Sequence, residues 1–340
     1  MKIAHFGLWA PNRSGLHEAT IEQILYERKE GIDSCLIHSE VENPDPNRFY
    51  DSERDVLAHG WDYAKDADVW VMHRTIPAKL MPMLSKKKNI AILHGTSEIM
   101  VMHEVESGGK NDKFNMHIGF LDTFQKVVTI TKSDTQIMRL YDKKKKIVFI
   151  NDSIDTDKYS PNGYLWDFKY RPAIISTTNV RINKNPSPLI WAMPRVIEEI
   201  PKARLNMFGL NLADINIWRN MILKSGPISV ALENIHNQFF DLTPFLRGAD
   251  ISFNSNYSGI FSRDSMEAMA CGCSIIAYTP EHTKYSCYRD TESIVSAIKT
   301  AWEDLKSNPE RQIEYNRQYA LDNFSWYRNI KKYIDLYNNL

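Results

Sequence analysis

An alternation of short β-rich apolar runs with helical stretches most constrains the fold, and it occurs twice along the 340 residues. Strands buried on both faces of a parallel sheet form such runs, and a crossover helix joins each strand to the next. The pattern therefore predicts an α/β fold with two parallel sheets. The expected strands are 3–7, 34–38, 69–73, 89–94, 126–130 and 147–150, then 173–177, 204–208, 228–231, 251–253 and 274–278. The clearest expected helices are 16–28, 133–141, 186–199 and 263–271.

Two domains are expected, because the alternation restarts near residue 172 and a chain of this length can build two hydrophobic cores. A polar, turn-forming segment at 151–161 separates the two series. We place the first domain at residues 1–160 and the second at 161–324. The tail, about 325–340, has the pattern of an amphipathic helix.

Composition excludes several classes of protein. The 42 Lys and Arg residues equal the 42 Asp and Glu residues, so the overall charge favours neither a nucleic-acid nor a membrane partner. No stretch is long and apolar enough for a membrane span, and the start resembles a strand rather than a signal peptide, which predicts a cytoplasmic protein. Four cysteines make no disulfide framework, and we expect Cys271 and Cys273 to serve in packing.

The segment 266–276, MEAMACGCSII, carries the most specific signal. An acidic residue enters a short helix of small residues, Gly272 ends the helix, and a β-branched strand follows. The segment resembles the donor site of family-four retaining glycosyltransferases of the GT-B fold. The resemblance implies two Rossmann-like, doubly wound parallel-sheet domains facing each other across a cleft, with the C-terminal helix packed back on the first domain. It also implies that Glu267 holds the donor ribose.

One departure from that family lies eight residues before Glu267, where the family has a second Glu that touches the donor sugar and this chain has Gly259. Ser258, Ser262 and Asp264 are near enough in sequence to offer substitute hydrogen bonds, although Asp264 could instead cap the helix. The enzyme could use a donor with different sugar hydroxyls, or contact the sugar through Ser262 and the loop N–H groups of Gly259, Ile260 and Phe261. Ser262 is therefore a candidate for the reacting centre.

A second match follows the first strand of the second series, where TTNVRINKNP places Arg181 and Lys184 at the carboxyl end of a parallel strand. Ligands of α/β proteins usually bind at this edge. The segment resembles the loop whose Arg and Lys neutralise the donor diphosphate in the same family. Without other evidence, Arg181 and Lys184 would be interpreted as solvated loop cations. The presence of Glu267 at the matching position downstream favours a role in binding the diphosphate. Gly209 follows the next strand and is expected beside the donor base.

The first domain is expected to supply the acceptor side. Its N-terminal loop ends at Gly15, where backbone N–H groups can face an anion, and it resembles a phosphate-facing loop of the family. His94 ends another strand at a position where the family often has a His near the reacting centre. We predict that His94 lines the site, and His73 is a weaker candidate of the same kind. Each of these histidines could instead be a satisfied structural residue.

We expect no metal or other cofactor, because the sequence Asp155-Thr156-Asp157 lies in the linker and reads as a turn. The predicted reaction moves a sugar, with retention, from a UDP- or GDP-sugar to a hydroxyl. A glycan or glycolipid is the favoured acceptor and a hydroxylated DNA base is possible, since two lysine runs, 86–88 and 143–146, could guide an anion. Two alternatives stay open: a nucleotide-sugar epimerase or hydrolase on the same scaffold, and a catalytically silent nucleotide-binding protein.

Overall fold

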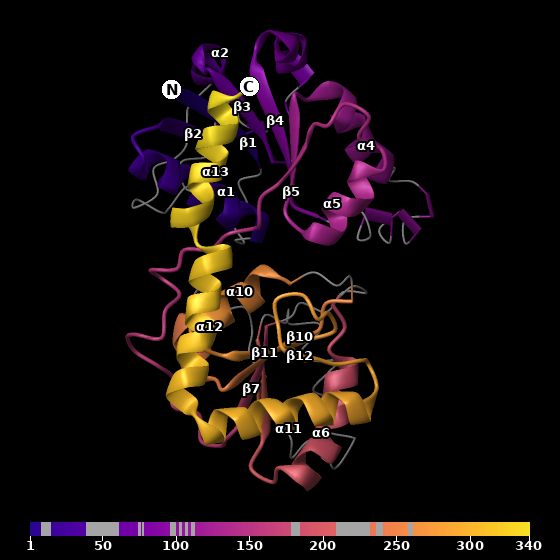
Figure 1. The fold of residues 1–340 in the computed structure, drawn as a ribbon, viewed down its shortest axis with the longest axis vertical. Coiled ribbons are helices and arrows are strands. Elements are labelled where there is room, and N and C mark those ends of the chain that lie inside the picture. Colours follow the sequence, from indigo (N-terminus) through magenta and orange to yellow (C-terminus); the bar gives the residue numbers. More distant parts are fainter. Residues whose placement is uncertain are drawn as a thin grey trace. The chain divides into compact units, whose positions relative to one another are not determined.

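The computed structural model divides into two compact units (Figure 1), and each is described by itself. Unit 1 contains Met1–Ile154 with Phe324–Leu340, and unit 2 contains Asp155–Asn323. The structure describes residues 1–7, 15–38, 61–73, 76, 78–95, 100–101, 104–105, 108–109, 113–177, 184–208, 232–235, 241–257 and 261–340.

Unit 1 is built around a six-stranded parallel sheet with the order β2-β1-β3-β4-β5-β6. The chain leaves β1 to one side for β2 and then returns to the other side for β3, so the strand order reverses between β1 and β3. Its strands are β1 (Lys2–Gly7), β2 (Asp33–His38), β3 (Val69–Met72), β4 (Lys88–Leu93), β5 (Lys126–Thr129) and β6 (Ile147–Phe149). Its helices include α1 (Gly15–Lys29), α2 (Asp62–Asp66), the 3-10 helix η2 (Ala78–Lys86), α4 (Lys113–Thr123), α5 (Lys132–Arg139) and α13 (Trp326–Asn338).

The two faces of this sheet bury different side chains, because successive residues of a strand point to opposite faces. In β3, Trp70 and Met72 belong to one apolar cluster, whereas Val69 and Val71 belong to the other. The second cluster also contains residues of α13, which lies beside α1 in the sequence-coloured ribbon (Figure 1). The C-terminal helix is thus part of the core of unit 1.

Unit 2 repeats the architecture with the strand order β12-β11-β10-β7-β8-β9, again all parallel. Here the order reverses between β7 and β10. The strands are β7 (Ala173–Thr177), β8 (Arg204–Phe208), β9 (Leu232–Ile235), β10 (Ile251–Asn254), β11 (Ser274–Ala277) and β12 (Tyr285–Ser286). The helices include α6 (Ser187–Glu199), α9 (Thr243–Gly248), α10 (Arg263–Ala270), α11 (Thr291–Ser307) and α12 (Pro309–Phe324).

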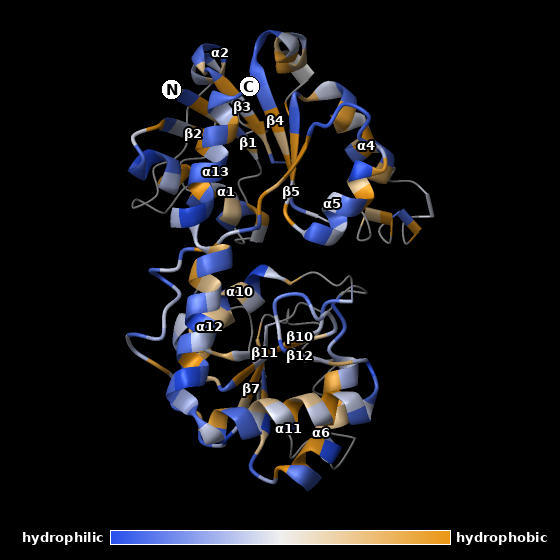
Figure 2. Cartoon of the chain, viewed as in Figure 1, coloured by the Kyte–Doolittle hydropathy of each residue, from blue (hydrophilic) through white to orange (hydrophobic). Residues whose placement is uncertain are grey.

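Hydropathy follows this layering. Strand β7 begins with the hydrophobic run Ala173-Ile174-Ile175, whereas outer helices such as α11 and α12 carry both hydrophobic and hydrophilic residues (Figure 2). The predicted α/β class with two doubly wound parallel sheets is confirmed. The predicted strand at 228–231 lies outside the described residues. Among the described helices, none is long and apolar enough to cross a membrane.

Candidate functional site

The carboxyl ends of β7 and β10 form the centre of the candidate site in unit 2. These strands are hydrogen-bonded neighbours, and the chain runs outward from them in opposite directions. Beyond the strand ends, Lys184 forms an isolated antiparallel bridge with Asn256. The bridge brings the predicted diphosphate loop beside the segment that follows β10. Ligands in open α/β sheets bind where the strand order reverses in this way.

Helix α10 begins at the same edge and is tied to it by a side chain. The Thr177 hydroxyl, at the end of β7, donates a 2.7 Å hydrogen bond to Asp264 in the first turn of α10. Ser262 is the N-cap residue, but its hydroxyl makes no capping bond to the helix backbone and lies 3.2 Å from the hydroxyl of Ser265. The start of α10 is therefore fixed in place by Asp264 rather than by a capping side chain.

Glu267 lies one turn further along α10, where Arg263 Nε donates a 3.1 Å hydrogen bond to its Oε1 atom. The Arg263 and Glu267 side chains are only 11% and 14% exposed, so the pair is largely shielded from water. An adjacent guanidinium favours the ionised carboxylate. A carboxylate can accept about four hydrogen bonds in all, from partners such as a guanidinium and hydroxyl groups.

The remaining predicted residues of unit 2 divide into two groups. Phe261 is 3% exposed, and its ring centroid lies 5.4 Å from that of His282, so its side chain serves in packing. Arg181, Gly209, Gly259 and Ile260 lie outside the described residues.

The cysteines and the linker carboxylates have structural roles. All four cysteines are free and buried, and burial raises the pKa of Cys271 to about 12. Such thiols are inert. Asp155 accepts hydrogen bonds from the backbone N–H groups of Asp157 and Lys158, which is the predicted turn. Within the described residues, no three His, Cys, Asp or Glu side chains converge as metal ligands would.

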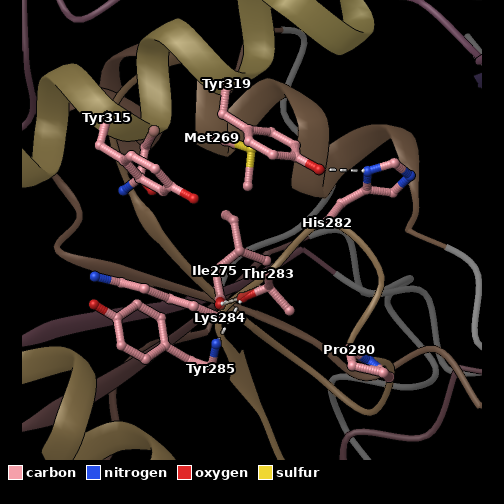
Figure 3. Close-up of a pocket in the computed structure, with 10 residues that line it drawn as sticks. Met269, Ile275, Pro280, His282, Thr283, Lys284, Tyr285, Tyr315 and Tyr319 are labelled. Atoms are coloured by element: carbon pink, nitrogen blue, oxygen red, sulfur yellow. Dashed lines mark hydrogen bonds between the residues drawn. The ribbon is translucent and has the colours of Figure 1, made fainter.

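A separate pocket of about 190 Å³ lies between the β11–β12 connection and α12 (Figure 3). Tyr285, Tyr315 and Tyr319 give it an aromatic lining. The ammonium group of Lys284 is held by Asp304 at 3.1 Å and by Gln312 at 2.9 Å. Because its cation already has an anionic partner, this pocket is a weaker diphosphate site than the edge at β7 and β10.

In unit 1, the predicted residues Gly15 and His94 both follow the carboxyl ends of strands. Gly15 is the first residue of α1, and His94 follows β4 and is half-buried. The structure joins His94 to two further imidazoles. Nε2 of His94 lies 2.7 Å from Nδ1 of His73, and Nε2 of His73 lies 2.8 Å from Nδ1 of His5. We call His5, His73 and His94 the imidazole row.

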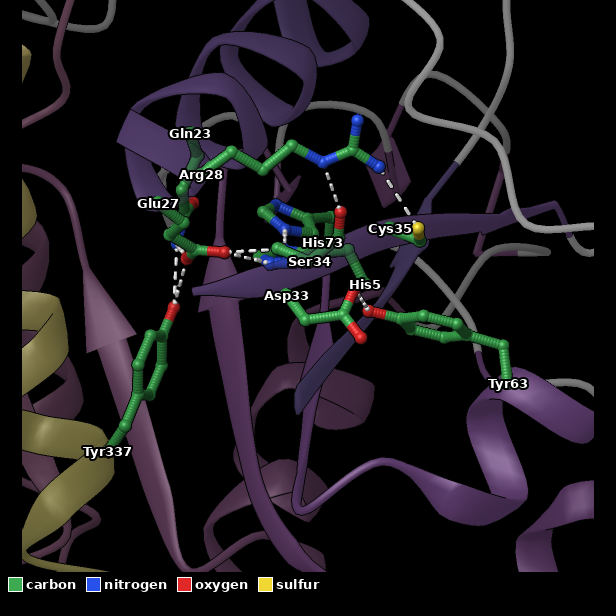
Figure 4. Close-up of polar contacts among 10 residues, drawn as sticks. All are labelled: His5, Gln23, Glu27, Arg28, Asp33, Ser34, Cys35, Tyr63, His73 and Tyr337. Atoms are coloured by element: carbon green, nitrogen blue, oxygen red, sulfur yellow. Dashed lines mark hydrogen bonds and ion pairs between the residues drawn. The ribbon is translucent and has the colours of Figure 1, made fainter. Parts of the chain in front are cut away.

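The imidazole row ends at Glu27 of α1, whose Oε2 atom lies 2.7 Å from Nε2 of His5 (Figure 4). Burial alone would raise the pKa of Glu27, but the neighbouring His5 and the hydrogen bonds from His5, Ser34 and Tyr337 outweigh it and hold that pKa below its usual value. Burial, together with His94 and His5, holds the pKa of His73 well below its ordinary value.

Sequence reasoning missed His5 and Glu27. The available signal was a histidine inside an apolar strand, since a buried imidazole needs polar partners. Residues two apart in a strand point to the same face of the sheet. His5, His73 and His94 each lie two residues after a member of one apolar cluster, namely Ile3, Val71 and Ile92, so the three histidines are expected on the same face.

Both lysine runs lie at the opposite edge of the sheet from His94. Lys88 begins β4, and the run at 143–146 immediately precedes β6. Two of these lysines are bound to backbone carbonyls: Lys87 donates to Ala67 at 2.8 Å and Lys146 to Phe124 at 2.6 Å. The runs therefore add no positive charge at the ligand edge of unit 1.

Comparison with solved structures identifies the fold. The chain matches sucrose-phosphate synthase from Thermosynechococcus elongatus with a TM-score of 0.74 at 13% identity, covering 99% of this chain and 98% of that one. HepE from Anabaena, in complex with UDP and glucose, gives 0.73 at 11% identity with complete coverage of both chains. An α-glucosyltransferase in complex with UDP-glucose and DNA containing an abasic site gives 0.69 at 14% identity, with 99% of each chain covered.

Neither a family model nor a curated protein matches the sequence. The structural matches nevertheless span the whole chain and both sheets. The protein therefore has the GT-B fold, with two Rossmann-like units.

Proposed function

We propose that this protein is a retaining, metal-independent glycosyltransferase that moves a sugar from a nucleoside-diphosphate donor to a hydroxyl acceptor. The observation that carries the proposal is the edge of unit 2 at β7 and β10, where Lys184 meets Asn256 and α10 begins. Strand reversal, a cation and a helix N-terminus together are suited to a nucleoside diphosphate.

Each group has a role in the proposed chemistry. Lys184, with Arg181, neutralises the diphosphate as it leaves, which is the charge that develops in the transition state. Glu267 accepts hydrogen bonds from the ribose hydroxyls, and its partner Arg263 holds the carboxylate from 3.1 Å. Ser262 and the loop N–H groups before it contact the donor sugar. The structural neighbours that hold UDP or UDP-glucose favour a UDP-sugar as the donor.

The favoured acceptor is the hydroxyl of a glycan or glycolipid. One structural neighbour holds DNA, so a hydroxylated base belongs in an acceptor panel. The lysine runs do not favour a polyanion, because they lie at the edge of unit 1 opposite His94. Uncharged glycans are thus the first acceptors to test.

Titration calorimetry with nucleoside diphosphates and their sugar conjugates, in the presence of EDTA, tests the proposal. We expect one diphosphate to bind without metal and one sugar conjugate to bind more tightly. Lys184→Gln should weaken binding about 10-fold to 100-fold, the loss expected for a charge-assisted hydrogen bond. Lys202→Gln is the matched control, because Lys202 is exposed and precedes β8 at the opposite edge of the sheet.

Three outcomes would contradict this assignment in different ways. Equal affinity of Lys184→Gln and Lys202→Gln for the nucleoside diphosphate would show that Lys184 does not bind it. Binding that requires a divalent ion would refute the metal-independent mechanism. Tight diphosphate binding that is indifferent to every sugar would favour a silent nucleotide-binding protein.

A further inference from the structure

The imidazole row and Glu27 connect four elements of unit 1 through one unbroken line of short contacts. Glu27 comes from α1, His5 from β1, and His73 and His94 follow β3 and β4. The three heavy-atom distances are 2.7, 2.8 and 2.7 Å. The planes of adjacent rings are inclined by only 26° and 29°. The ring centroids are 5.1 and 5.0 Å apart, whereas the facing nitrogens are 2.8 and 2.7 Å apart, so the imidazoles meet edge to edge.

Burial makes this line costly unless it is fully bonded. Glu27 and His5 are completely buried, and His73 is 5% exposed. A buried carboxylate is stable only when hydrogen bonds and nearby charge compensate for lost hydration. Glu27 has that compensation: its Oε1 atom accepts from the Tyr337 hydroxyl at 2.8 Å, and its Oε2 atom accepts from Ser34 as well as from His5.

The ionised carboxylate fixes the direction of the hydrogen bonds. Because Glu27 can only accept, His5 must donate through Nε2. When all three rings are neutral, Nδ1 of His5 accepts from Nε2 of His73, and Nδ1 of His73 accepts from Nε2 of His94. In that arrangement the lone pair at the end of the row is on Nδ1 of His94, the half-buried member of the row.

We propose that Glu27 and the imidazole row form a proton relay, which allows His94 to take the proton of an acceptor hydroxyl bound at the carboxyl edge of unit 1. This inference rests on the proposed transferase function. His94 is its catalytic residue, and His73, His5 and Glu27 are positioning residues behind it.

The proton balance of the step is explicit. The acceptor oxygen bonds to the anomeric carbon as the bond between that carbon and the diphosphate oxygen breaks, and the hydroxyl proton passes to Nδ1 of His94. The Nε2 proton of His94 moves to Nδ1 of His73, and the Nε2 proton of His73 moves to Nδ1 of His5. The positive charge then rests on His5 beside Glu27, and the reverse sequence later releases the proton to solvent.

A carboxylate lies beside His5, whereas imidazoles lie on both sides of His73. Burial and the two flanking imidazoles lower the pKa of His73, so a proton on this ring is disfavoured. His5 has the Glu27 carboxylate at 2.7 Å. The groups packed around that carboxylate are Gln23 of α1, Ser34 of β2 and Tyr337 of α13, which offer hydrogen bonds and no second carboxylate.

His73→Gln separates a relay from a purely structural network. The amide of Gln can donate to one neighbour and accept from the other, so it preserves the bridge, but it cannot pass on a proton as imidazole does. We expect kcat at pH 7 to fall at least tenfold and the acid limb of its pH profile to move, with unchanged affinity for the nucleoside diphosphate. His117→Gln is the control, because His117 is a buried histidine of unit 1 outside the row.

Nitrogen-15 NMR of the histidine-labelled full chain supplies a readout that does not depend on turnover. We expect couplings across the N–H···N bonds between His5 and His73 and between His73 and His94, both absent in His73→Gln. If the couplings are observed but no nucleotide binds, the transferase function is refuted, and the relay proposed for that function is refuted with it. Nucleotide binding and turnover without couplings, or kcat and pH profile equal in the two variants, would overturn the relay alone.

Discussion

At the scale of single residues, Gly272 shows how the small-residue segment of α10 is terminated. Its φ of +100° lies in the left-handed region, and an added Cβ would lie 2.7 Å from Cγ2 of Ile313. The backbone N–H of Gly272 donates a hydrogen bond to the carbonyl oxygen of Met269, and that of Cys273 donates to the carbonyl oxygen of Ala268. A side chain here would be strained and would also collide with α12.

Gly272→Ala should therefore destabilise unit 2 by about 1–2 kcal/mol from backbone strain alone, with the collision adding to that loss. Gly31→Ala is the matched comparison, because Gly31 has a φ of +77° but open space around its missing Cβ. Urea unfolding monitored in each unit measures both losses. Equal losses would show that the Ile313 contact relaxes at no cost.

His73 gives unit 1 a specific pH dependence. It stays neutral in the folded protein because its pKa is lowered, whereas in the unfolded chain it titrates near 6.5. Its contribution to stability is complete above pH 6.5 and is lost as the pH falls below that value. The loss has a limiting slope of about 1.4 kcal/mol per pH unit.

Melting temperatures between pH 7.5 and 5 test this dependence. The wild type should lose stability over that range more steeply than His73→Gln, which has no imidazole to protonate. The lowered pKa of Glu27 acts in a more acidic range, so it does not obscure the comparison. Parallel curves for the two proteins would show that His73 titrates normally when folded.

At the scale of elements, arginines hold the segment between the two sheets against unit 2. Arg317 of α12 donates to the carbonyl oxygens of Tyr159 at 2.6 Å, Thr156 at 2.7 Å and Ala270 at 3.3 Å. Arg247 of α9 adds bonds to the carbonyls of Ser160 and Lys158. One guanidinium thus ties the linker to the end of α10.

Arg317→Lys should cost about 1–3 kcal/mol, because an ammonium group cannot reproduce the fork of donors to three carbonyls. Arg311→Lys makes the same change at an exposed position of the same helix and should be nearly neutral. Chemical denaturation of both variants measures the difference. If Arg317→Lys leaves the free energy of unfolding unchanged, water molecules replace the lost hydrogen-bond donors.

Strands and their ends were predictable because they depend on local pattern. The expected strands at 173–177 and 204–208 coincide with β7 and β8, and the helix expected at 263–271 is α10 within one residue. The two-residue strand β12 was missed, since its pairing with β11 depends on tertiary contact. The long helices α11 and α12 were missed although they have helical patterns.

The candidate site was predictable only in part for the same reason. Lys184 and Glu267 could be identified from short motifs, but the Lys184–Asn256 bridge depends on which strands become neighbours. Alternation along each strand can place His5, His73 and His94 on the same face of the sheet, but it cannot show that the three side chains are neighbours. Sheet order alone makes them adjacent, because β1, β3 and β4 are consecutive in space.

At the scale of the whole molecule, α13 completes unit 1 from the far end of the sequence. Trp326, Ile330, Tyr333 and Tyr337 are buried in the same cluster as Ile3 and Val71. Trp326 Nε1 also donates a 2.9 Å hydrogen bond to Glu22 of α1. Each large apolar side chain that is buried in this way contributes about 1.5–3 kcal/mol.

A chain that ends at Asn323 should therefore lose the cooperative unfolding of unit 1 while unit 2 stays folded and keeps its diphosphate affinity. Amide hydrogen exchange, read separately for the two units, checks this expectation. A chain that ends at Asn338 retains the whole of α13 and serves as the control. Persistent protection of β1 and β3 in the shorter chain would show that α13 is dispensable.

The discontinuity of unit 1 also imposes an order on biosynthesis. A ribosome releases β1 to β6 long before it makes α13, so the first half of the protein must wait with an uncovered apolar face. Unit 2 is one continuous segment and can fold as soon as it emerges. The half that is synthesised first is therefore the half that is finished last, and it is where we expect nascent chains to need chaperones.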